Sequence, residues 1–160
     1  MIKLINRDLA LVKYRKFPLL AYDETLDEDV FYGPEYIGSY EIKLKDENYT
    51  VLIEELLKLL DLFKTTDELI FLGQIDKPWI AKTMSKRFRF VTYNKAMRFF
   101  KKNNIWTKFN GAVKVEKEDF KEFLTHFLIL TKFEGYFWDH YFSDENQNIL
   151  FSIHYSEQIQ

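Results

Sequence analysis

Hydrophobic residues repeat with a helical period in two segments of the chain. Over residues 49–64, apolar side chains recur at spacings of three and four, and Asp46 or Asn48 precedes them as a possible cap. A second stripe of the same kind runs over residues 117–132. The pattern predicts two helices that pack one face on a core. The stripes are Leu52, Ile53, Leu56, Leu57, Leu60 and Phe63, and then Phe120, Phe123, Leu124, Phe127 and Leu130.

Shorter apolar segments, alternating or continuous, predict the strands. A short third helix follows from Asn94, which can cap it, to about Lys102. For the last two strands we expect a hairpin that pairs Phe142 with Ile149, because a slip of one residue would mix its apolar and polar faces. The predicted strands are Ile2–Tyr14, Phe17–Tyr22, Tyr40–Lys45, Leu69–Leu72, Arg87–Thr92, Ala112–Val115, Gly135–Phe142 and Ile149–Tyr155.

These elements predict one α+β domain over residues 1–160, with two main helices packed on a mostly antiparallel sheet and a C-terminal β-hairpin. The composition, 47% hydrophobic and 30% charged, is typical of an ordered globular protein. Because the chain has no cysteine, disulfides, thiolate zinc sites and cysteine nucleophiles are excluded. Charges at Lys3, Arg7 and Asp8 interrupt the first apolar segment, and no apolar stretch has the length of a membrane span. We therefore expect a cytoplasmic protein without a membrane partner.

The net charge of −2 conceals a strong segregation of charge along the chain. Residues 17–42 hold seven acids and no lysine or arginine, whereas residues 81–115 hold ten bases and no acid. The two segments thus carry −7 and +10. Such asymmetry bears on partners and association rates rather than on the fold.

The acidic segment contains the first candidate surface. Residues Asp23–Gly38 combine acids, aromatic residues, two glycines and a proline, which predicts a long loop, and long loops in compact domains are often functional. Carboxylates would steer a basic partner, and tyrosines would anchor it. The alternative is a solvated loop that only keeps the chain soluble. The predicted partner-binding residues are Asp23, Glu24, Asp27, Glu28, Asp29, Tyr32, Glu35 and Tyr36.

The basic segment supports a second hypothesis, a nucleic-acid-binding module over residues 82–102. Its lysines and arginines could follow phosphates while the interleaved aromatic rings stack on bases. However, the helical spacing of Tyr93, Met97 and Phe100 favours burial of aromatic residues in the core, and the chain is slightly acidic overall. Nucleic acid is therefore the less favoured partner.

Catalytic alternatives have weaker support. Glu41 and Lys43 match the end of a metal-dependent nuclease pattern, with Asp29 as an earlier acid, but a tripeptide of this kind is common by chance. Two groups that contain a histidine lack a nucleophile or a further ligand. They are Asp139 and His154, near Tyr141, and the pair Glu122 and His126. We predict no catalytic residues, no metal site and no cofactor.

The acidic segment Asp23–Asp29, the high aromatic content and the terminal hairpin give the chain a character that resembles bacterial immunity proteins, which neutralise toxins of contact-dependent growth inhibition and related polymorphic systems. The resemblance covers the whole chain but contains no diagnostic motif, so no residue role is carried over. It implies a cytoplasmic, non-catalytic protein that forms a heterodimer with one cognate toxin domain, often a nuclease, and blocks its active site or substrate access.

Overall fold

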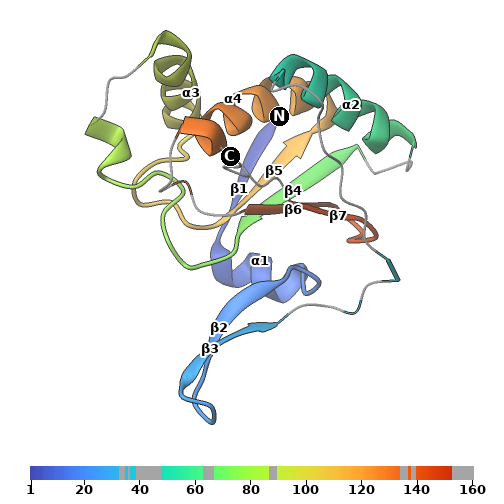
Figure 1. Cartoon of the computed structure of the whole chain (residues 1–160), viewed down its shortest axis with the longest axis vertical. Helices are drawn as coiled ribbons and strands as arrows, with labels where there is room; N and C mark the ends of the chain where they lie inside the picture. Colours follow the sequence, from blue (N-terminus) through green and yellow to red (C-terminus); the bar gives the residue numbers. More distant parts are fainter. Residues whose placement is uncertain are drawn as a thin grey trace, which may run out of the picture.

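The computed structural model is a five-stranded sheet with helices on both faces and a separate hairpin that projects from one end (Figure 1). It describes residues 1–32, 35, 37–38, 48–62, 67–86, 90–133, 137 and 140–152. In these residues the helices are α1 (Arg7–Lys13), α2 (Tyr49–Leu62), α3 (Val91–Lys102) and α4 (Phe120–Phe133), with 3₁₀ turns η1 (Met84–Lys86) and η2 (Lys117–Asp119). The strands are β1 (Ile2–Ile5), β2 (Leu19–Asp23), β3 (Glu28–Tyr32), β4 (Glu68–Gly73), β5 (Ala112–Glu116), β6 (His140–Asp144) and β7 (Leu150–Ser152).

The main sheet has the order β1-β5-β4-β6-β7, and each neighbouring pair is antiparallel. The predicted α+β fold with a mostly antiparallel sheet is therefore confirmed. The central strand β4 is covered on both faces, and its residues Leu69–Leu72 are fully buried. That double burial explains why its sequence is a continuous apolar run rather than an alternating one.

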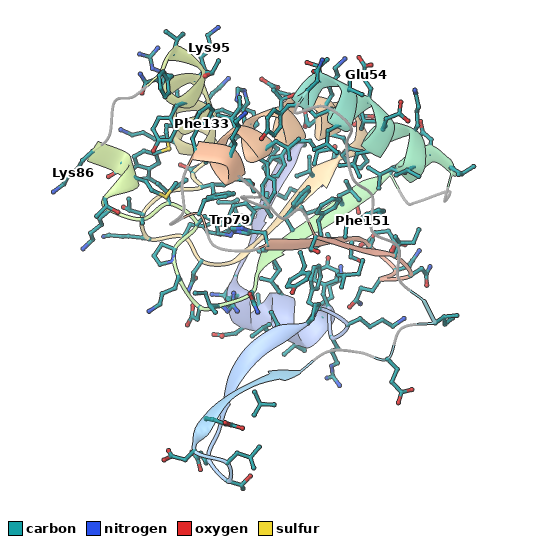
Figure 2. The ribbon with its side chains drawn as sticks, in the orientation of Figure 1. Glu54, Trp79, Lys86, Lys95, Phe133 and Phe151 are labelled. Carbon is teal, nitrogen blue, oxygen red and sulfur yellow. The ribbon has the colours of Figure 1, made fainter. Side chains whose placement is uncertain are left out.

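Helices α2, α3 and α4 cover one face of the sheet, as Figure 1 shows. The two strongest helical predictions are confirmed. Helix α4 buries its whole predicted stripe, and α2 buries Ile53, Leu56 and Leu60 of its stripe, whereas Phe63 lies outside the described residues. Asn48 caps α2, since its side-chain oxygen accepts hydrogen bonds from the backbone N–H groups of Thr50 and Val51. Trp79 lies at the centre of this core (Figure 2) and donates a 2.8 Å hydrogen bond from its indole N–H to the Gly111 carbonyl.

The opposite face of the sheet carries α1, which the sequence did not predict. The prediction of one strand over Ile2–Tyr14 is wrong, because Asn6 ends β1 by accepting hydrogen bonds from the N–H groups of Asp8 and Leu9 and so caps a helix. Ala10 and Tyr14, four residues apart, then face the sheet. Arg7 fastens the start of α1 by donating hydrogen bonds to the carbonyls of Gly73 and Asn110.

The terminal hairpin exists, but its register differs from the prediction. Phe142 pairs with Phe151 rather than Ile149, a shift of two residues that preserves the predicted parity of the faces. The physical reason is Asp144, which is 3% exposed and accepts hydrogen bonds from the backbone N–H groups of Asn148 and Ile149, so that β6 extends to this residue. The first residues predicted for β6, and Ile153–Tyr155, lie outside the described residues.

The start of α3 also departs from the prediction. The helix begins at Val91, so the end of the predicted strand Arg87–Thr92 is helical, and residues 87–89 lie outside the described part of the chain. Asn94 lies within the helix and does not cap it; the N-cap position is Phe90, which makes no side-chain cap. The helix ends at Lys102, as predicted, with Asn103 as its C-cap.

The close packing between Gly111 and β1 can be tested by substitution. A Cβ atom at this position would lie 2.0 Å from the backbone oxygen of Ile5, where β1 meets the segment before β5. Because backbone atoms must move to relieve this overlap, we expect Gly111→Ala to lower the free energy of unfolding by about 1–3 kcal/mol in urea titrations. Gly38→Ala is the control, since a Cβ there meets nothing within 4 Å. Equal stability of the two variants would contradict the described junction.

Candidate functional site

The acidic segment folds as a β-hairpin, not as the long loop predicted over Asp23–Gly38. Strands β2 and β3 pair antiparallel from Leu19 opposite Tyr32 to Asp23 opposite Glu28. A tight turn over residues 24–27 joins them, with Asp27 in the left-handed region at φ 55°. Aspartate tolerates this conformation better than most residues. The sequence suggested a loop because acidic residues are poor strand formers. The run Val30-Phe31-Tyr32 was the signal that could have indicated a strand.

The base of the hairpin is attached to the core, and its tip is not. Phe17 is 4% exposed and packs with Tyr14, and Leu19 packs against the same apolar cluster under the sheet. From there the hairpin extends beyond α1, away from the main sheet, to the end of the molecule's longest axis (Figure 1). At the tip Leu26 is 59% exposed. The hairpin is therefore anchored at its base and exposes its tip to solvent.

Most of the predicted site residues lie on this hairpin. Glu24, Asp27 and Glu28 are exposed at the turn. For Asp23, Asp29 and Tyr32 the structure describes the backbone, which places the two aspartates beside the turn and Tyr32 opposite Leu19 near the base. Glu35 is exposed beyond β3, and Tyr36 lies outside the described residues. The fold thus gathers five acids at one tip and separates Tyr32 and Glu35 from them.

The strand register places like charges opposite each other. Asp23 faces Glu28 across the hairpin, with Glu24 and Asp27 in the turn between them. Like charges in directly opposed positions destabilise a strand pair. Local folding stability does not explain this arrangement, and a basic partner would relieve the repulsion. We call Asp23–Asp29 the acidic tip.

Of the catalytic alternatives, the described structure brings together only Glu122 and His126, which lie one turn apart on α4. Glu41, Lys43, Asp139 and His154 lie outside the described residues, and Asp29 lies on the hairpin. His126 lies against Phe99 with the ring centroids 4.4 Å apart, and burial lowers the pKa of its imidazole. His140 is 4% exposed among the rings of Trp79 and Phe137. Both histidines therefore pack as part of the core.

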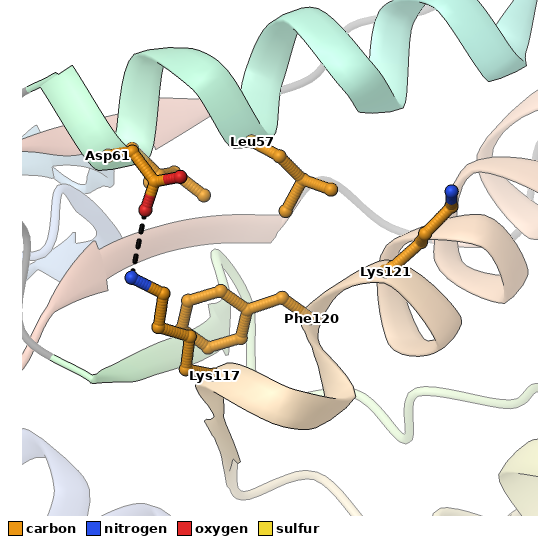
Figure 3. A pocket seen from close by; sticks show the side chains of 6 residues that line it. Leu57, Asp61, Lys117, Phe120 and Lys121 are labelled. Atoms are coloured by element: carbon orange, nitrogen blue, oxygen red, sulfur yellow. Dashed lines mark hydrogen bonds and ion pairs between the residues drawn. The ribbon is translucent and has the colours of Figure 1, made fainter.

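A small cavity between α2 and the start of α4 is a further candidate (Figure 3). Its volume is about 200 Å³, and Leu57, Leu60 and Phe120 form its apolar wall. The charged groups at its mouth include Asp61 and Lys117, which form an ion pair of 2.8 Å. Since cavities that hold small molecules usually measure about 300–1,000 Å³, this one is too small for a ligand site.

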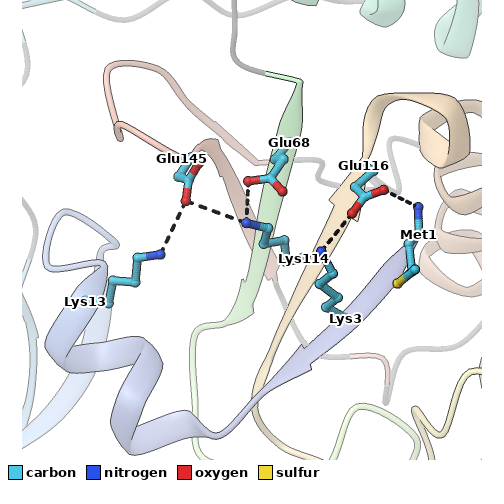
Figure 4. A network of polar contacts seen from close by, with 7 residues as sticks. All are labelled: Met1, Lys3, Lys13, Glu68, Lys114, Glu116 and Glu145. Atoms are coloured by element: carbon cyan, nitrogen blue, oxygen red, sulfur yellow. Dashed lines mark hydrogen bonds and ion pairs between the residues drawn. The ribbon is translucent and has the colours of Figure 1, made fainter.

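Charged side chains line the part of the second sheet face that α1 leaves uncovered (Figure 4). Lys114 forms ion pairs with Glu68 and Glu145, and Glu145 also binds Lys13 at 3.3 Å. Glu116 accepts hydrogen bonds of 2.9 Å from both Lys3 and the amino group of Met1. Asp119 also pairs with the Met1 amino group, so the network holds four cations and four carboxylates. Its charges are thus balanced internally, and it stabilises the sheet rather than forming a binding site.

Four bases of the second charged segment, Lys95, Arg98, Lys101 and Lys102, lie on α3, at the other end of the long axis from the acidic tip (Figure 1). Lys114 belongs to the ion-pair network of the sheet, and Arg87 and Arg89 lie outside the described residues. The helix buries Tyr93, Ala96, Met97 and Phe100, as the helical spacing predicted, and points its lysines and arginine to solvent. The two charged segments therefore form separate surfaces.

No family model, curated protein or solved structure matches this chain. Among the described residues, no group of three or more histidines and carboxylates could hold a metal ion, and no helix has the length and apolarity to cross a membrane.

Glu116 gives the network of Figure 4 a testable pH dependence. Hydrogen bonds from Lys3 and from the Met1 amino group lower the pKa of Glu116 to about 2. A carboxylate with a lowered pKa stabilises the fold above its unfolded pKa, near 4.3, and loses this contribution as the pH falls toward the folded value. The unfolding temperature of wild type should therefore be higher than that of Glu116→Gln at pH 6. The difference between the two unfolding temperatures should disappear between about pH 4.5 and 2.

Glu118→Gln is the matched control, because Glu118 is exposed and forms none of the ion pairs among the described residues. Its unfolding temperature should follow that of wild type at each pH. A gap between wild type and Glu116→Gln that stays constant down to pH 2 would contradict the proposed pairing.

Proposed function

We propose that this protein binds and inhibits a basic protein partner through the acidic tip of its hairpin. Its action is that of an immunity protein: it forms a heterodimer with a cognate toxin domain in the cytoplasm and blocks the toxin's active site or substrate access without catalysis. The observation that carries this proposal is the projection of five clustered acids on a hairpin that contains no base, at one end of the molecule.

The charge of the tip favours a nuclease as the partner. A nuclease needs a basic surface to hold phosphates, so a carboxylate cluster of suitable shape can occupy the same surface and compete with the substrate. The tip is narrow enough to enter a cleft, because only the residues 24–27 separate its two strands. Carboxylates on such a tip would speed the encounter with the cleft and exclude the nucleic acid from it.

Affinity also needs apolar contact, and Leu26 supplies it. This side chain lies at the turn between Glu24 and Asp27 and is 59% exposed. Interfaces usually gain most of their binding energy from a few apolar or aromatic anchors, surrounded by charges that fix orientation and rate. Leu26 would fill an apolar pocket in the basic cleft while the carboxylates pair around it.

The test compares two variants with the same change of charge. The tip variant carries Glu24→Gln, Asp27→Asn and Glu28→Gln, and the control carries Glu54→Gln, Glu118→Gln and Glu122→Gln at exposed sites on the helical side. Asparagine at position 27 keeps the tolerance for positive φ, so the turn is retained. Each immobilised protein is exposed to a lysate of the source organism, and each retained protein is then purified and expressed alone and with this chain.

We expect wild type and the control to retain one basic protein that stops growth when expressed alone, and to restore growth when co-expressed. The tip variant should associate about tenfold more slowly at low salt, with weaker salt dependence, and should fail to restore growth. If the tip variant binds and protects as well as the control, the acidic tip is not the interface. If no retained protein is toxic, the immunity function is wrong.

A further inference from the structure

The surface around α3 carries an excess of positive charge that the proposed inhibition does not use. Seven bases here are exposed, and residues 81–115 contain no acid. Figure 2 shows Lys86 and Lys95 pointing outward at this end of the molecule. We define the α3 basic surface by these bases, which are Lys82, Lys86, Lys95, Arg98, Lys101, Lys102 and Lys108.

Among the described residues, these charges have no partner in an ion pair. Lysines elsewhere form ion pairs, among them Lys3 with Glu116, Lys58 with Glu55 and Lys117 with Asp61. Within the described parts of the chain, no ion pair involves any of the seven bases. Clustered bases repel one another, and an anion bound among them would relieve this repulsion.

The bases of α3 form a line along one helical face. Lys95, Arg98 and Lys102 are separated by three and four residues, which places them on the same side of the helix, opposite the buried Tyr93, Met97 and Phe100. At a rise of about 1.5 Å per residue, the seven-residue step from the first to the last covers roughly 10 Å. A line of cations of this length fits a chain of regularly spaced anions better than one compact anion.

An exposed aromatic ring lies at the N-terminal end of α3. Phe90 immediately precedes α3 and is 58% exposed, with the ring packed on one side against Phe133 at a centroid distance of 5.6 Å. The contact with Phe133 holds the ring in place, and its exposed surface can receive a flat partner. Lys101, by contrast, lies over the ring of Trp106 at 5.3 Å, so part of its role is structural.

We propose that the α3 basic surface binds single-stranded nucleic acid, with Lys95, Arg98 and Lys102 on the phosphodiester backbone and Phe90 stacked on a base. A charged line with an aromatic platform is the combination by which proteins hold single strands without reading their sequence. Base stacking requires an unpaired base, which favours a single strand over a duplex. An acidic protein would fit the charge, but it would not account for a ring held in place at the end of the line.

This site is independent of the proposed inhibition, because it lies on other elements at the opposite end of the long axis (Figure 1). Binding is measured by fluorescence anisotropy with labelled oligo(U) and oligo(dT) of about twenty nucleotides, enough to cover a single-strand site. The α3 variant carries Lys95→Gln, Arg98→Gln and Lys102→Gln. Its control carries Lys16→Gln, Lys77→Gln and Lys121→Gln, which are exposed and remove the same charge elsewhere. Unfolding temperatures confirm that both are folded.

We expect wild type to bind both oligonucleotides at about 50 mM salt and to lose affinity steeply by about 200 mM. The α3 variant should bind at least about tenfold more weakly, and its plot of log affinity against log salt should be shallower by about 2, since each lost contact with a single strand removes about 0.7. The control should stay within about threefold of wild type, because charge away from the site acts only through the screened field. Equal affinity for the two oligonucleotides would mean that the site recognises the phosphodiester backbone. Tighter binding of oligo(U) would mean that the site prefers RNA. Both results support the site.

Phe90→Ala tests the stacking contact separately. It should weaken binding about tenfold, as loss of one stacked base does, whereas Val91→Ala beside it should not. Three results would overturn the proposal. The first is that neither oligonucleotide binds at about 50 mM salt, and the second is that the α3 variant and its control weaken binding equally. The third is that poly-glutamate displaces labelled oligo(U) as effectively as unlabelled oligo(U) does. The last result would identify an acidic protein as the partner.

Discussion

The structure depends on the burial of Trp79 at the junction of the sheet with α3 and α4. The indole N–H donates to the Gly111 carbonyl just before β5, and the backbone N–H of Trp79 donates to the Phe109 carbonyl. The ring itself lies within 6.4 Å, centroid to centroid, of rings on every neighbouring element of this core, namely Phe100, Phe109, Phe123, Phe127, Phe137 and His140. One side chain thus combines a buried, satisfied polar group with a large apolar area, and it fixes α3, α4 and the start of β5 relative to one another.

The two charged ends of the molecule lie outside the core around Trp79. The exposed carboxylates at the tip of the hairpin and the bases Lys95, Arg98 and Lys102 on the outer face of α3 lie outside the apolar core of the sheet and its three covering helices. The acidic tip even places Asp23 opposite Glu28, against local stability. Charge separated in this way gives the two ends opposite fields, and this is the basis on which we propose a basic protein as the partner of the hairpin and a polyanion as the partner of α3.

The sequence predicted best those elements whose pattern is set by the core. Helices α2 and α4 and the strand β4 follow from apolar stripes and runs that only a buried environment explains. The failures arise where local chemistry overrides hydrophobicity. Asn6 turns an apolar run into the helix α1, a tight turn at Asp27 turns a predicted loop into a hairpin, and Asp144 shifts the register of the terminal hairpin by two residues. For the candidate site, the sequence located the acids, but only the strand pairing gathers five of them at one tip and sets Tyr32 and Glu35 apart.

The central claim is that the acidic tip serves binding and not folding. The most direct test replaces residues 23–28 by Asn-Gly, a two-residue turn that keeps Tyr22 opposite Asp29 and shortens the hairpin. The retention of the basic partner is then measured on this variant, whose unfolding temperature serves as the check on its core. The account predicts a wild-type unfolding temperature and loss of the partner. Full retention of the partner by the shortened hairpin would contradict it.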